Sequence, residues 1–235
     1  MKAAIIAAGR GERLHAAGIA EPKPLVRVAG RPLIDYALGA IATAGIERVA
    51  CIVNEYSTGI EEHCRQAWPQ LACEFVRRTT PNSMESLFTL APLLGEGRFA
   101  LLTVDAVFAP TTLTHFLAGA RQRVGADVVL GLTDFVDDEK PLWARIAPDG
   151  RVLALGDAAR PCATITAGLY VFDPRVFVEI DSARTQGFTA LRRFLGHLLE
   201  RGYRIDAEPV GKSVDVDRRE DIAVAEAFVA AGFAS

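Results

Sequence analysis

The first 23 residues place the strongest constraint on how this chain can fold. A short apolar run, residues 3–8, leads directly into a turn with Gly9 and Gly11, and Arg13 and Lys23 follow. An apolar run that ends at glycines is typical of a buried strand, and cations beside a glycine turn can bind phosphate. We therefore predict a strand, a tight turn and a phosphate site in this segment.

Apolar runs of strand length alternate with segments of helical spacing through residue 132. The expected strands are 48–53, 74–77, 99–104 and 127–132, and the expected helices are 32–45, 60–67, a helix that starts at about residue 82, and 111–123. The helix near residue 82 carries the signature of a capping box, with Asn82 three residues before Glu85. Alternation of this kind predicts an α/β protein with a mainly parallel sheet and helices on both faces.

Beyond residue 133 the pattern changes. Residues 143–147 and 152–155 flank the turn Pro148-Asp-Gly150, which predicts a β-hairpin. Further strands are expected at 164–172 and 203–210, and further helices at 188–201 and 220–231. No linker or repeat interrupts the chain, so we expect a single domain, 1–235, in which the hairpin is a small insertion beside a pocket.

Composition limits the partners. The chain has 235 residues, half of them hydrophobic, and a net charge of -3, which provides no broad cationic surface for nucleic acid or an anionic membrane. Its four cysteines form no CxxC pair, and no apolar stretch approaches the roughly 18 to 20 residues of a membrane helix. We predict a soluble, cytoplasmic protein that binds small anions, with no nucleic acid and no membrane partner.

Acidic residues follow the phosphate-binding pattern at two later points. Asp105 comes directly after the strand expected at 99–104, and Asp215 and Asp217 stand near the end of the sequence. Ligands of open α/β sheets bind outside the carboxyl ends of the strands, and Mg²⁺ is usually held by one or two carboxylates together with substrate phosphates. Cations and carboxylates at one edge of the sheet therefore predict a Mg²⁺-nucleotide site.

Each of these features also has a simpler interpretation. The glycine turn could be no more than a tight turn, Asp105 and Asp217 could cap helices, and Lys23 could form a solvated charge pair with Glu21. The GxxxxGK motif of a P-loop is absent, and so is the GxGxxG spacing that a Rossmann dehydrogenase requires. The combination of features favours the nucleotide site over chance.

Three segments resemble a known family. AAIIAAGRGERL and EPKPLVRVAGRPLIDYAL resemble the N-terminal signature of the sugar-1-phosphate nucleotidyltransferases and their alcohol-phosphate relatives, and VDVDRREDIAVAEAF resembles their terminal metal-ligand strand and helix. The resemblance implies a Rossmann-like, three-layer nucleotidyltransferase fold. It also implies a nucleotide-binding half, residues 1–132, and a half that binds the acceptor and completes the metal site, residues 133–235.

The resemblance further implies roles for individual residues. Those expected at the nucleotide are Ala7, Ala8, Gly9, Gly11, Arg13, Lys23, Asn82 and Ser86. Within this set Ala7, Ala8 and Gly9 would lie close to the base, and Arg13 and Lys23 would be the catalytic cations at the phosphates. Asp105 together with Asp215 or Asp217 would carry Mg²⁺.

Finer features point to one branch of that family. The segment 82–88, NSMESLF, resembles the N-x-x-x-S-L motif of phosphocholine and inositol-1-phosphate cytidylyltransferases, which implies CTP as the donor and a small phosphomonoester as the acceptor. The alternatives are a hexose-1-phosphate uridylyl- or guanylyltransferase and a non-catalytic NTP-binding module. One departure from the family pattern is Val104, which precedes Asp105 where glycine is common.

The sequence gives less information about the pocket that would bind the acceptor. Trp143 and Tyr170 are candidates for an aromatic wall around a quaternary ammonium, although core packing in the hairpin region explains both better. Lys140, Lys212 and His15 are candidate substrate contacts, and solvated surface positions explain them as readily. The sequence also leaves the oligomeric state undecided, a homodimer included.

Overall fold

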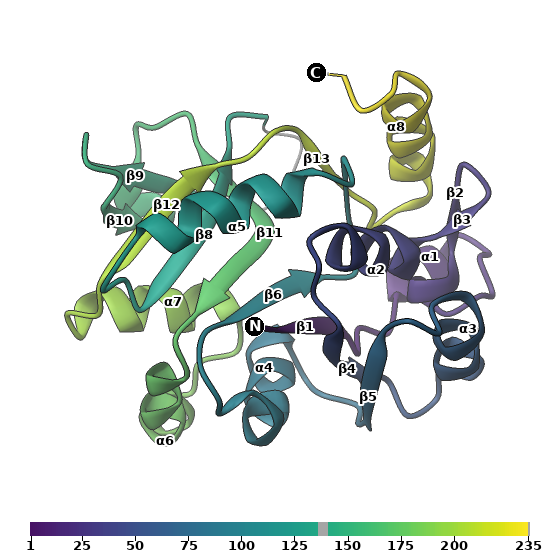
Figure 1. Cartoon of the computed structure of the whole chain (residues 1–235), viewed down its shortest axis with the longest axis horizontal. Helices are drawn as coiled ribbons and strands as arrows, with labels where there is room; N and C mark the ends of the chain where they lie inside the picture. The colour runs from purple at the N-terminus through teal and green to yellow at the C-terminus, as the bar shows by residue number, and fades with distance from the viewer. Residues whose placement is uncertain (136–140, 235) are drawn as a thin grey trace.

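A single mixed sheet runs through the computed structural model, which describes residues 1–135 and 141–234. The sheet has seven strands in the order β12-β8-β11-β6-β1-β4-β5 (Figure 1). Their bounds are β1 (Lys2–Ala7), β4 (Arg48–Val53), β5 (Ala72–Arg77), β6 (Phe99–Thr103), β8 (Val128–Thr133), β11 (Ile165–Phe172) and β12 (Ile205–Pro209). Strand β11 runs antiparallel to both of its neighbours, and the other pairs are parallel, which confirms the predicted mainly parallel sheet.

Helices cover both faces of the sheet, as Figure 1 shows. The elements on one face are α2 (Leu33–Thr43), α3 (Ile60–Ala67) and α5 (Thr112–Gln122), and those on the other are α4 (Ser83–Leu94), α6 (Ile180–Thr185) and α7 (Leu191–Glu200). Successive side chains of β1 alternate between the two cores, with Ile5 in the first and Ile6 in the second. Because both faces are buried, each central strand is apolar throughout, and this is why the sequence shows uninterrupted apolar runs.

Smaller elements complete the chain around this sheet. The predicted hairpin is present as β9 (Ala144–Ile146) and β10 (Val152–Leu155), and its turn contains Gly150 at a φ of +85°. The remaining elements are α1 (Glu12–Ala16), β2 (Arg27–Val28), β3 (Arg31–Pro32), β7 (Ala106–Phe108), β13 (Ser213–Asp215), α8 (Arg219–Ala230) and the 3₁₀ turns Lys23–Leu25, Gly156–Ala159 and Pro174–Glu179.

A third apolar cluster joins the two ends of the chain. Leu14 of α1, Val28 of β2 and Val107 of β7 pack with Val214 of β13 and Phe228 of α8. In Figure 1 the yellow helix α8 accordingly lies beside the purple β2–β3 ribbon. This packing brings the segment around residue 217 to the carboxyl edge of β1 and β6.

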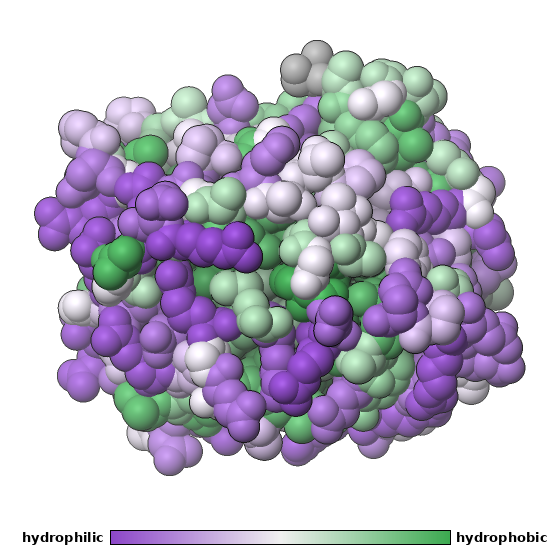
Figure 2. Space-filling model, viewed as in Figure 1, coloured by the Kyte–Doolittle hydropathy of each residue, from purple (hydrophilic) through white to green (hydrophobic). Residues whose placement is uncertain are grey.

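The surface carries polar side chains over most of the face drawn in Figure 2, with an apolar group over α8 at the upper right. Val224 of α8 is an exposed apolar side chain, 40% accessible. Across the residues that the structure describes, no helix combines the length and the apolar character needed to cross a bilayer.

Candidate active site

A cavity of about 800 Å³ opens at the carboxyl edge of the sheet. Its walls come from the segments that follow β1, β5 and β6, from the start of α4 and from the chain after β13. The lining residues are Ile6, Ala8, Gly9, Arg10, Gly11, Glu12, Arg13, Lys23, Thr79, Thr80, Pro81, Asn82, Ser83, Ser86, Thr103, Val104, Asp105 and Asp217. This is the edge at which ligands of open α/β sheets bind.

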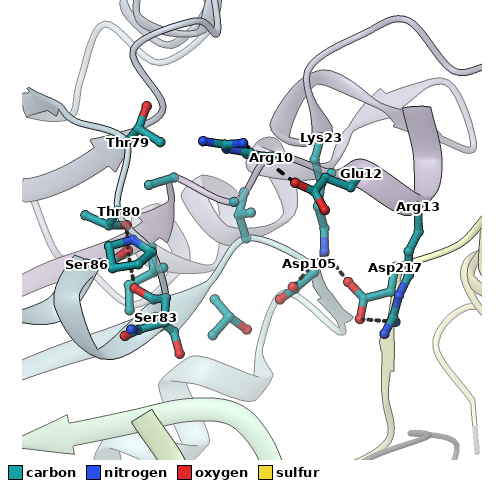
Figure 3. Close-up of a pocket in the computed structure, with 18 residues that line it drawn as sticks. Arg10, Glu12, Arg13, Lys23, Thr79, Thr80, Ser83, Ser86, Asp105 and Asp217 are labelled. Atoms are coloured by element: carbon teal, nitrogen blue, oxygen red, sulfur yellow. Dashed lines mark hydrogen bonds and ion pairs between the residues drawn. The ribbon is translucent and has the colours of Figure 1, made fainter. Parts of the chain in front are cut away.

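Lys23 is the centre of a charge cluster on one side of the cavity (Figure 3). Its Nζ donates to Oδ2 of Asp105 at 2.8 Å and to Oδ1 of Asp217 at 2.5 Å, and its side chain is 8% exposed. Arg13 Nη1 lies 3.5 Å from Oδ2 of Asp217. Four residues that the sequence analysis proposed from three separate segments therefore meet at one point.

The charges of this cluster stabilise one another. Burial alone would lower the pKa of Lys23, but the neighbouring charges of Asp105 and Asp217 outweigh burial and raise that pKa above its ordinary value. Burial would likewise raise the pKa of Asp105, yet Lys23 holds it below its ordinary value. Lys23 and Asp105 are thus both ionised at neutral pH, and Lys23 is a buried ammonium rather than half of a solvated pair with Glu21.

The glycine turn is shaped by its contact with Lys23. Gly11 has a φ of +62°, and a Cβ added there would lie 3.1 Å from Cβ of Lys23. A larger residue at position 11 would therefore be strained in its backbone and crowded against the lysine. Glycine at this position allows the turn after β1 to pass close to the cation that completes the charge cluster.

The structure also tests the helix-capping interpretations of the two aspartates. Asp105 stands between β6 and β7, and no helix follows it directly. At the start of α8 the carboxylate of Asp221 accepts the backbone N–H groups of Asp217 and Arg218, at 2.8 and 2.7 Å. The side chain of Asp217 is therefore directed to Lys23 and Arg13 instead of to a cap.

The side of the cavity opposite the charge cluster is rich in hydroxyl groups. Figure 3 shows Thr79, Thr80, Ser83 and Ser86 there, across the view from Lys23 and the aspartates. The sequence predicts Asn82 and Ser86 as site residues in this region but neither of the threonines. Their position in the sequence could have indicated the two threonines, because they follow the carboxyl end of β5.

Asn82 starts α4 as expected, but the capping box is only half formed. Oδ1 of Asn82 accepts the backbone N–H of Glu85 at 3.0 Å. The carboxylate of Glu85 instead accepts Nε and Nη2 of Arg184, at 3.0 and 2.8 Å. The reciprocal bond predicted from the sequence is replaced by an ion pair that ties the start of α4 to α6.

The remaining predicted nucleotide and metal residues divide into two groups. Ala8 and Gly9 line the cavity, whereas the side chain of Ala7 is 1% exposed and packs in the core behind it. Asp215 is exposed at the end of β13, where it pairs with Ala106, and it does not line the cavity. Of the two C-terminal aspartates, the structure thus brings Asp217 into the charge cluster.

Val104 fits the loop before Asp105 without strain. It is 5% exposed, and its backbone N–H donates to the carbonyl of Ile6 at 3.2 Å. Positive φ among the described non-glycine residues is confined to Ala29 and Phe233, so the backbone at Val104 does not need glycine. Valine in place of the common glycine therefore does not prevent Asp105 from lining the cavity.

The candidate acceptor residues lie apart from one another. Tyr170 is 7% exposed, and burial raises its pKa to about 12, as expected of a core tyrosine. Trp143 is half-buried and stacks under the guanidinium of Arg160, 4.9 Å from the ring centre. The described ring contacts do not pair Trp143 with Tyr170, so they give no support to an aromatic wall, and the core interpretation holds for Tyr170.

The candidate polar contacts of the acceptor also lie outside the cavity lining. Lys212 Nζ lies 4.0 Å from the ring centre of Phe135, and Nδ1 of His15 is 2.8 Å from the carbonyl of Ile19. Neither residue is among those that line the cavity. Lys140 falls outside the described residues.

The carboxylates of the charge cluster fit a divalent cation that takes further ligands from a substrate. Asp105 and Asp217 converge on a single ammonium group, which shows that the two can share one cation. Within the described ranges, no group of three or more His, Cys, Asp or Glu side chains is arranged to hold a metal. This donor set suits Mg²⁺, which is commonly bound by one or two carboxylates and substrate phosphates.

Comparison with known proteins identifies the family to which this chain belongs. The model of the MobA-like NTP transferase domain matches residues 3–198. CMP-5'-(3-aminopropyl)phosphonate synthase of Streptomyces rubellomurinus is 31% identical over 164 residues, which are 61% of this chain and 26% of that protein. The bifunctional protein GlmU of Pelotomaculum thermopropionicum is 27% identical over 238 residues, 94% of this chain and 50% of that protein. The chain therefore spans half or less of the length of these relatives.

Solved structures share the fold. The inositol-1-phosphate CTP transferase from T. maritima superposes with a TM-score of 0.83 at 19% identity, covering 100% of this chain and 98% of that one. A UDP-glucose pyrophosphorylase complexed with UDP-glucose gives a TM-score of 0.79 at 18% identity and covers 98% of each chain. The chain belongs to the MobA-like NTP transferase domain family, and the predicted three-layer nucleotidyltransferase fold is confirmed.

Proposed function

We propose that this protein transfers CMP from CTP to a small molecule that carries a terminal phosphate or phosphonate, with release of pyrophosphate. The observation that carries the proposal is the convergence of Lys23, Asp105 and Asp217 at one end of a cavity whose opposite end is lined by hydroxyl groups. A nucleoside triphosphate has the same asymmetry, with its charge at one end and its base at the other.

The charged end would hold the triphosphate. Arg13 and Lys23 provide positive charge there, and the turn from Gly9 to Gly11 brings backbone close to the same point. Charge develops on the leaving pyrophosphate as the bond between the α- and β-phosphates breaks. Cations that are already fixed in place stabilise that charge without reorganisation during the reaction.

The attacking group is an oxygen of the acceptor. A phosphomonoester is largely dianionic near neutral pH, because its second pKa is about 6, so its oxygen can attack the α-phosphorus in line without a general base. The cavity accordingly offers cations and carboxylates to position the two substrates. Mg²⁺ held by Asp105 and Asp217 would supply positive charge to the phosphate oxygens of both substrates.

Relatives support cytidylyl transfer in particular. Besides the CMP-aminopropylphosphonate synthase, a 2-aminoethylphosphonate cytidylyltransferase of Lancefieldella rimae is 29% identical over 46% of this chain. Both relatives act on phosphonates. The acceptor class proposed here therefore includes phosphonates in addition to the phosphate esters predicted from the sequence. Because GlmU is also among the relatives, a hexose-1-phosphate nucleotidyltransferase is the enzyme alternative to a cytidylyltransferase.

Pyrophosphate release tests this proposal. The purified protein would be assayed with CTP, UTP, GTP and ATP in turn, with Mg²⁺ and with choline phosphate, inositol-1-phosphate, 2-aminoethylphosphonate or glucose-1-phosphate as acceptor. We expect release with CTP and one of the first three acceptors. Product only with UTP or GTP and the hexose phosphate would establish the alternative enzyme.

A non-catalytic module gives a third result. In that case NTP would bind tightly in calorimetry and no pyrophosphate would be released with any acceptor. The unstrained backbone at Val104 and the position of Asp105 at the cavity argue against this outcome.

A further inference from the structure

The end of the cavity opposite the charge cluster is lined in part by two threonines, Thr79 and Thr80, from the loop after β5. Figure 3 places them across the view from the charge cluster, where the base of a bound nucleotide would lie if the triphosphate occupies the charged end. A hydroxyl can donate one hydrogen bond and accept two. Which of these it offers to a base depends on where its proton is already directed.

Asn54 determines the proton position at Thr79, and its own orientation is fixed. It follows β4 and is 3% exposed. Its Nδ2 donates to the carbonyl of Ala8 at 3.2 Å, and its Oδ1 accepts the backbone N–H of Tyr56 at 2.9 Å. A carbonyl can only accept and a backbone N–H can only donate, so exchange of the amide oxygen and nitrogen would break both bonds.

Thr79 must therefore give its proton to Asn54. Its Oγ1 lies 3.3 Å from Oδ1 of Asn54, and an amide oxygen can only accept. The single proton of the Thr79 hydroxyl is directed into the protein. Toward the cavity this oxygen can act only as an acceptor.

Ser86 fixes the proton of the Thr80 hydroxyl in a similar way. Ser86 is 2% exposed, and its Oγ donates to the carbonyl of Asn82 at 3.2 Å. Because that bond uses the only proton of Ser86, the 2.6 Å contact between the Ser86 and Thr80 hydroxyls must be donated by Thr80. Thr80 is then also an acceptor toward the cavity. Ser86, predicted as a nucleotide contact, accepts this bond and orients Thr80.

We infer that Thr79 and Thr80 select a base with an exocyclic amino group, cytosine in the proposed reaction. The amino group of cytosine carries two donor hydrogens, whereas uracil presents a carbonyl acceptor at the same position. Two acceptor oxygens would pair with the former and remain unpaired against the latter, and a site built in this way rejects the analogue that lacks the donor. The inference rests on the proposed binding of a nucleoside triphosphate in this cavity.

Equilibrium binding without an acceptor tests the inference separately from catalysis. Calorimetry would compare CTP, UTP and the triphosphate of pyrimidin-2-one riboside, which lacks the amino group, on wild type, Thr79→Val and Thr80→Val. We expect wild type to bind CTP at least ~10-fold more tightly than either other nucleotide. Each valine should reduce that preference by about 3- to 10-fold, the range for one hydrogen bond, and leave UTP affinity within about 2-fold.

Thr89→Val is the matched control. Thr89 lies on α4, donates to the carbonyl of Glu85 at 2.7 Å and does not line the cavity. It should keep the wild-type preference for CTP. Thermal unfolding of all three variants would show that each is folded under the binding conditions.

The outcomes separate this inference from the proposed function. Equal affinity of wild type for CTP and UTP, or an equal loss for both in the valine variants, would overturn the base assignment even if pyrophosphate is released. A wild type with the expected CTP preference that releases no pyrophosphate with any acceptor would contradict transfer and leave the base assignment standing. Failure to bind any triphosphate would overturn both.

Discussion

Lys23 and Glu179 are both buried charged residues, and each lies at the centre of a small cluster. Lys23 contacts Asp105 and Asp217 and faces the cavity. Glu179, at the end of the 3₁₀ turn before α6, accepts Nε2 of His197 at 2.9 Å, the hydroxyl of Tyr203 at 3.2 Å and Nε of Arg201 at 3.4 Å. Neither Glu179 nor His197 lines the cavity.

The two clusters perturb ionisation in the same way. Burial alone would raise the pKa of Glu179, but the bond from His197 and the charge of Arg201 hold it below its ordinary value, as Lys23 does for Asp105. A perturbed, buried charge is therefore not enough to mark a functional site. The two clusters differ in that the Lys23 cluster opens into a cavity. We therefore predict that substitutions in the Lys23 cluster affect turnover and that those in the Glu179 cluster affect stability.

The largest effect is expected from Asp105→Asn. The change keeps the size of the side chain and removes the negative charge beside Lys23, so turnover should fall at least ~100-fold, the scale of losing one pre-organised charge. Pyrophosphate release measures the loss, and the thermal unfolding midpoint should stay near that of wild type. Asp149→Asn, on the exposed hairpin turn, is the control and should retain full activity. Wild-type turnover in Asp105→Asn would refute the site.

Lys23→Ala should lower turnover by a similar factor, because it removes a positive charge where Asp105→Asn removes a negative one. Without the ammonium the triphosphate loses a fixed cation, and Asp105 and Asp217 lose their shared partner. We expect turnover to fall at least ~100-fold while circular dichroism shows a folded protein. Activity within a few-fold of wild type would mean that Lys23 serves only to hold the aspartates.

Glu179→Gln should show the reverse pattern. The variant should lose about 1 to 3 kcal/mol of unfolding free energy, because buried partners lose a charged acceptor, and keep turnover within about 2-fold. Denaturant titration measures the first quantity and pyrophosphate release the second. Glu200→Gln, at the exposed end of α7, is the control. A large loss of turnover in Glu179→Gln at full stability would break the distinction between the clusters.

The same variant has an expected pH signature. Since the pKa of Glu179 in the folded protein lies below its ordinary value of 4.5, the unfolded chain takes up this proton first as the pH falls. The stability from Glu179 is therefore present above about pH 4.5 and is lost as the pH falls through the folded pKa. The difference in unfolding free energy between wild type and Glu179→Gln should shrink over that range, and a difference that grows toward acid pH would contradict the assignment.

The smallest effect is expected from Lys212→Ala. The sequence made this lysine a candidate for the acceptor phosphate, but its ammonium lies over the rings of Phe135 and Phe228, at 4.0 and 5.2 Å from their centres. Turnover and the Michaelis constant for the acceptor should both stay within about 2-fold of wild type. A 10-fold rise in that constant would contradict this prediction and support Lys212 as a contact of the acceptor.

The sequence predicted the sheet and the charged end of the cavity well, for a physical reason. Strands buried on both faces are apolar throughout, so β4 and α3 could be located to their observed bounds, 48–53 and 60–67. A glycine turn with cations after an apolar run indicated the phosphate site, and the resemblance added roles for Lys23, Asp105 and Asp217. The short helix α1 was missed because its five residues are too few for a periodic pattern to appear.

The hydroxyl-lined end could not be predicted in the same way. Thr79 and Thr80 are ordinary loop residues in sequence, and their acceptor character depends on Asn54 and Ser86, which only the fold brings to them. Asp215 and Asp217 share one face of an extended segment, so the sequence could not choose between them. Packing of Val214 and Val216 in the third apolar cluster places Asp217 at Lys23.

A crystal structure with CTP and Mg²⁺ tests the central claim most directly, because the claim assigns opposite ends of one cavity to the two ends of one molecule. We predict the triphosphate beside Arg13 and Lys23, and the amino group of cytosine within hydrogen-bond distance of the Thr79 or Thr80 hydroxyl. A nucleotide bound in the reverse direction, with its base against Asp105 and Asp217, or bound outside this cavity, would contradict the account.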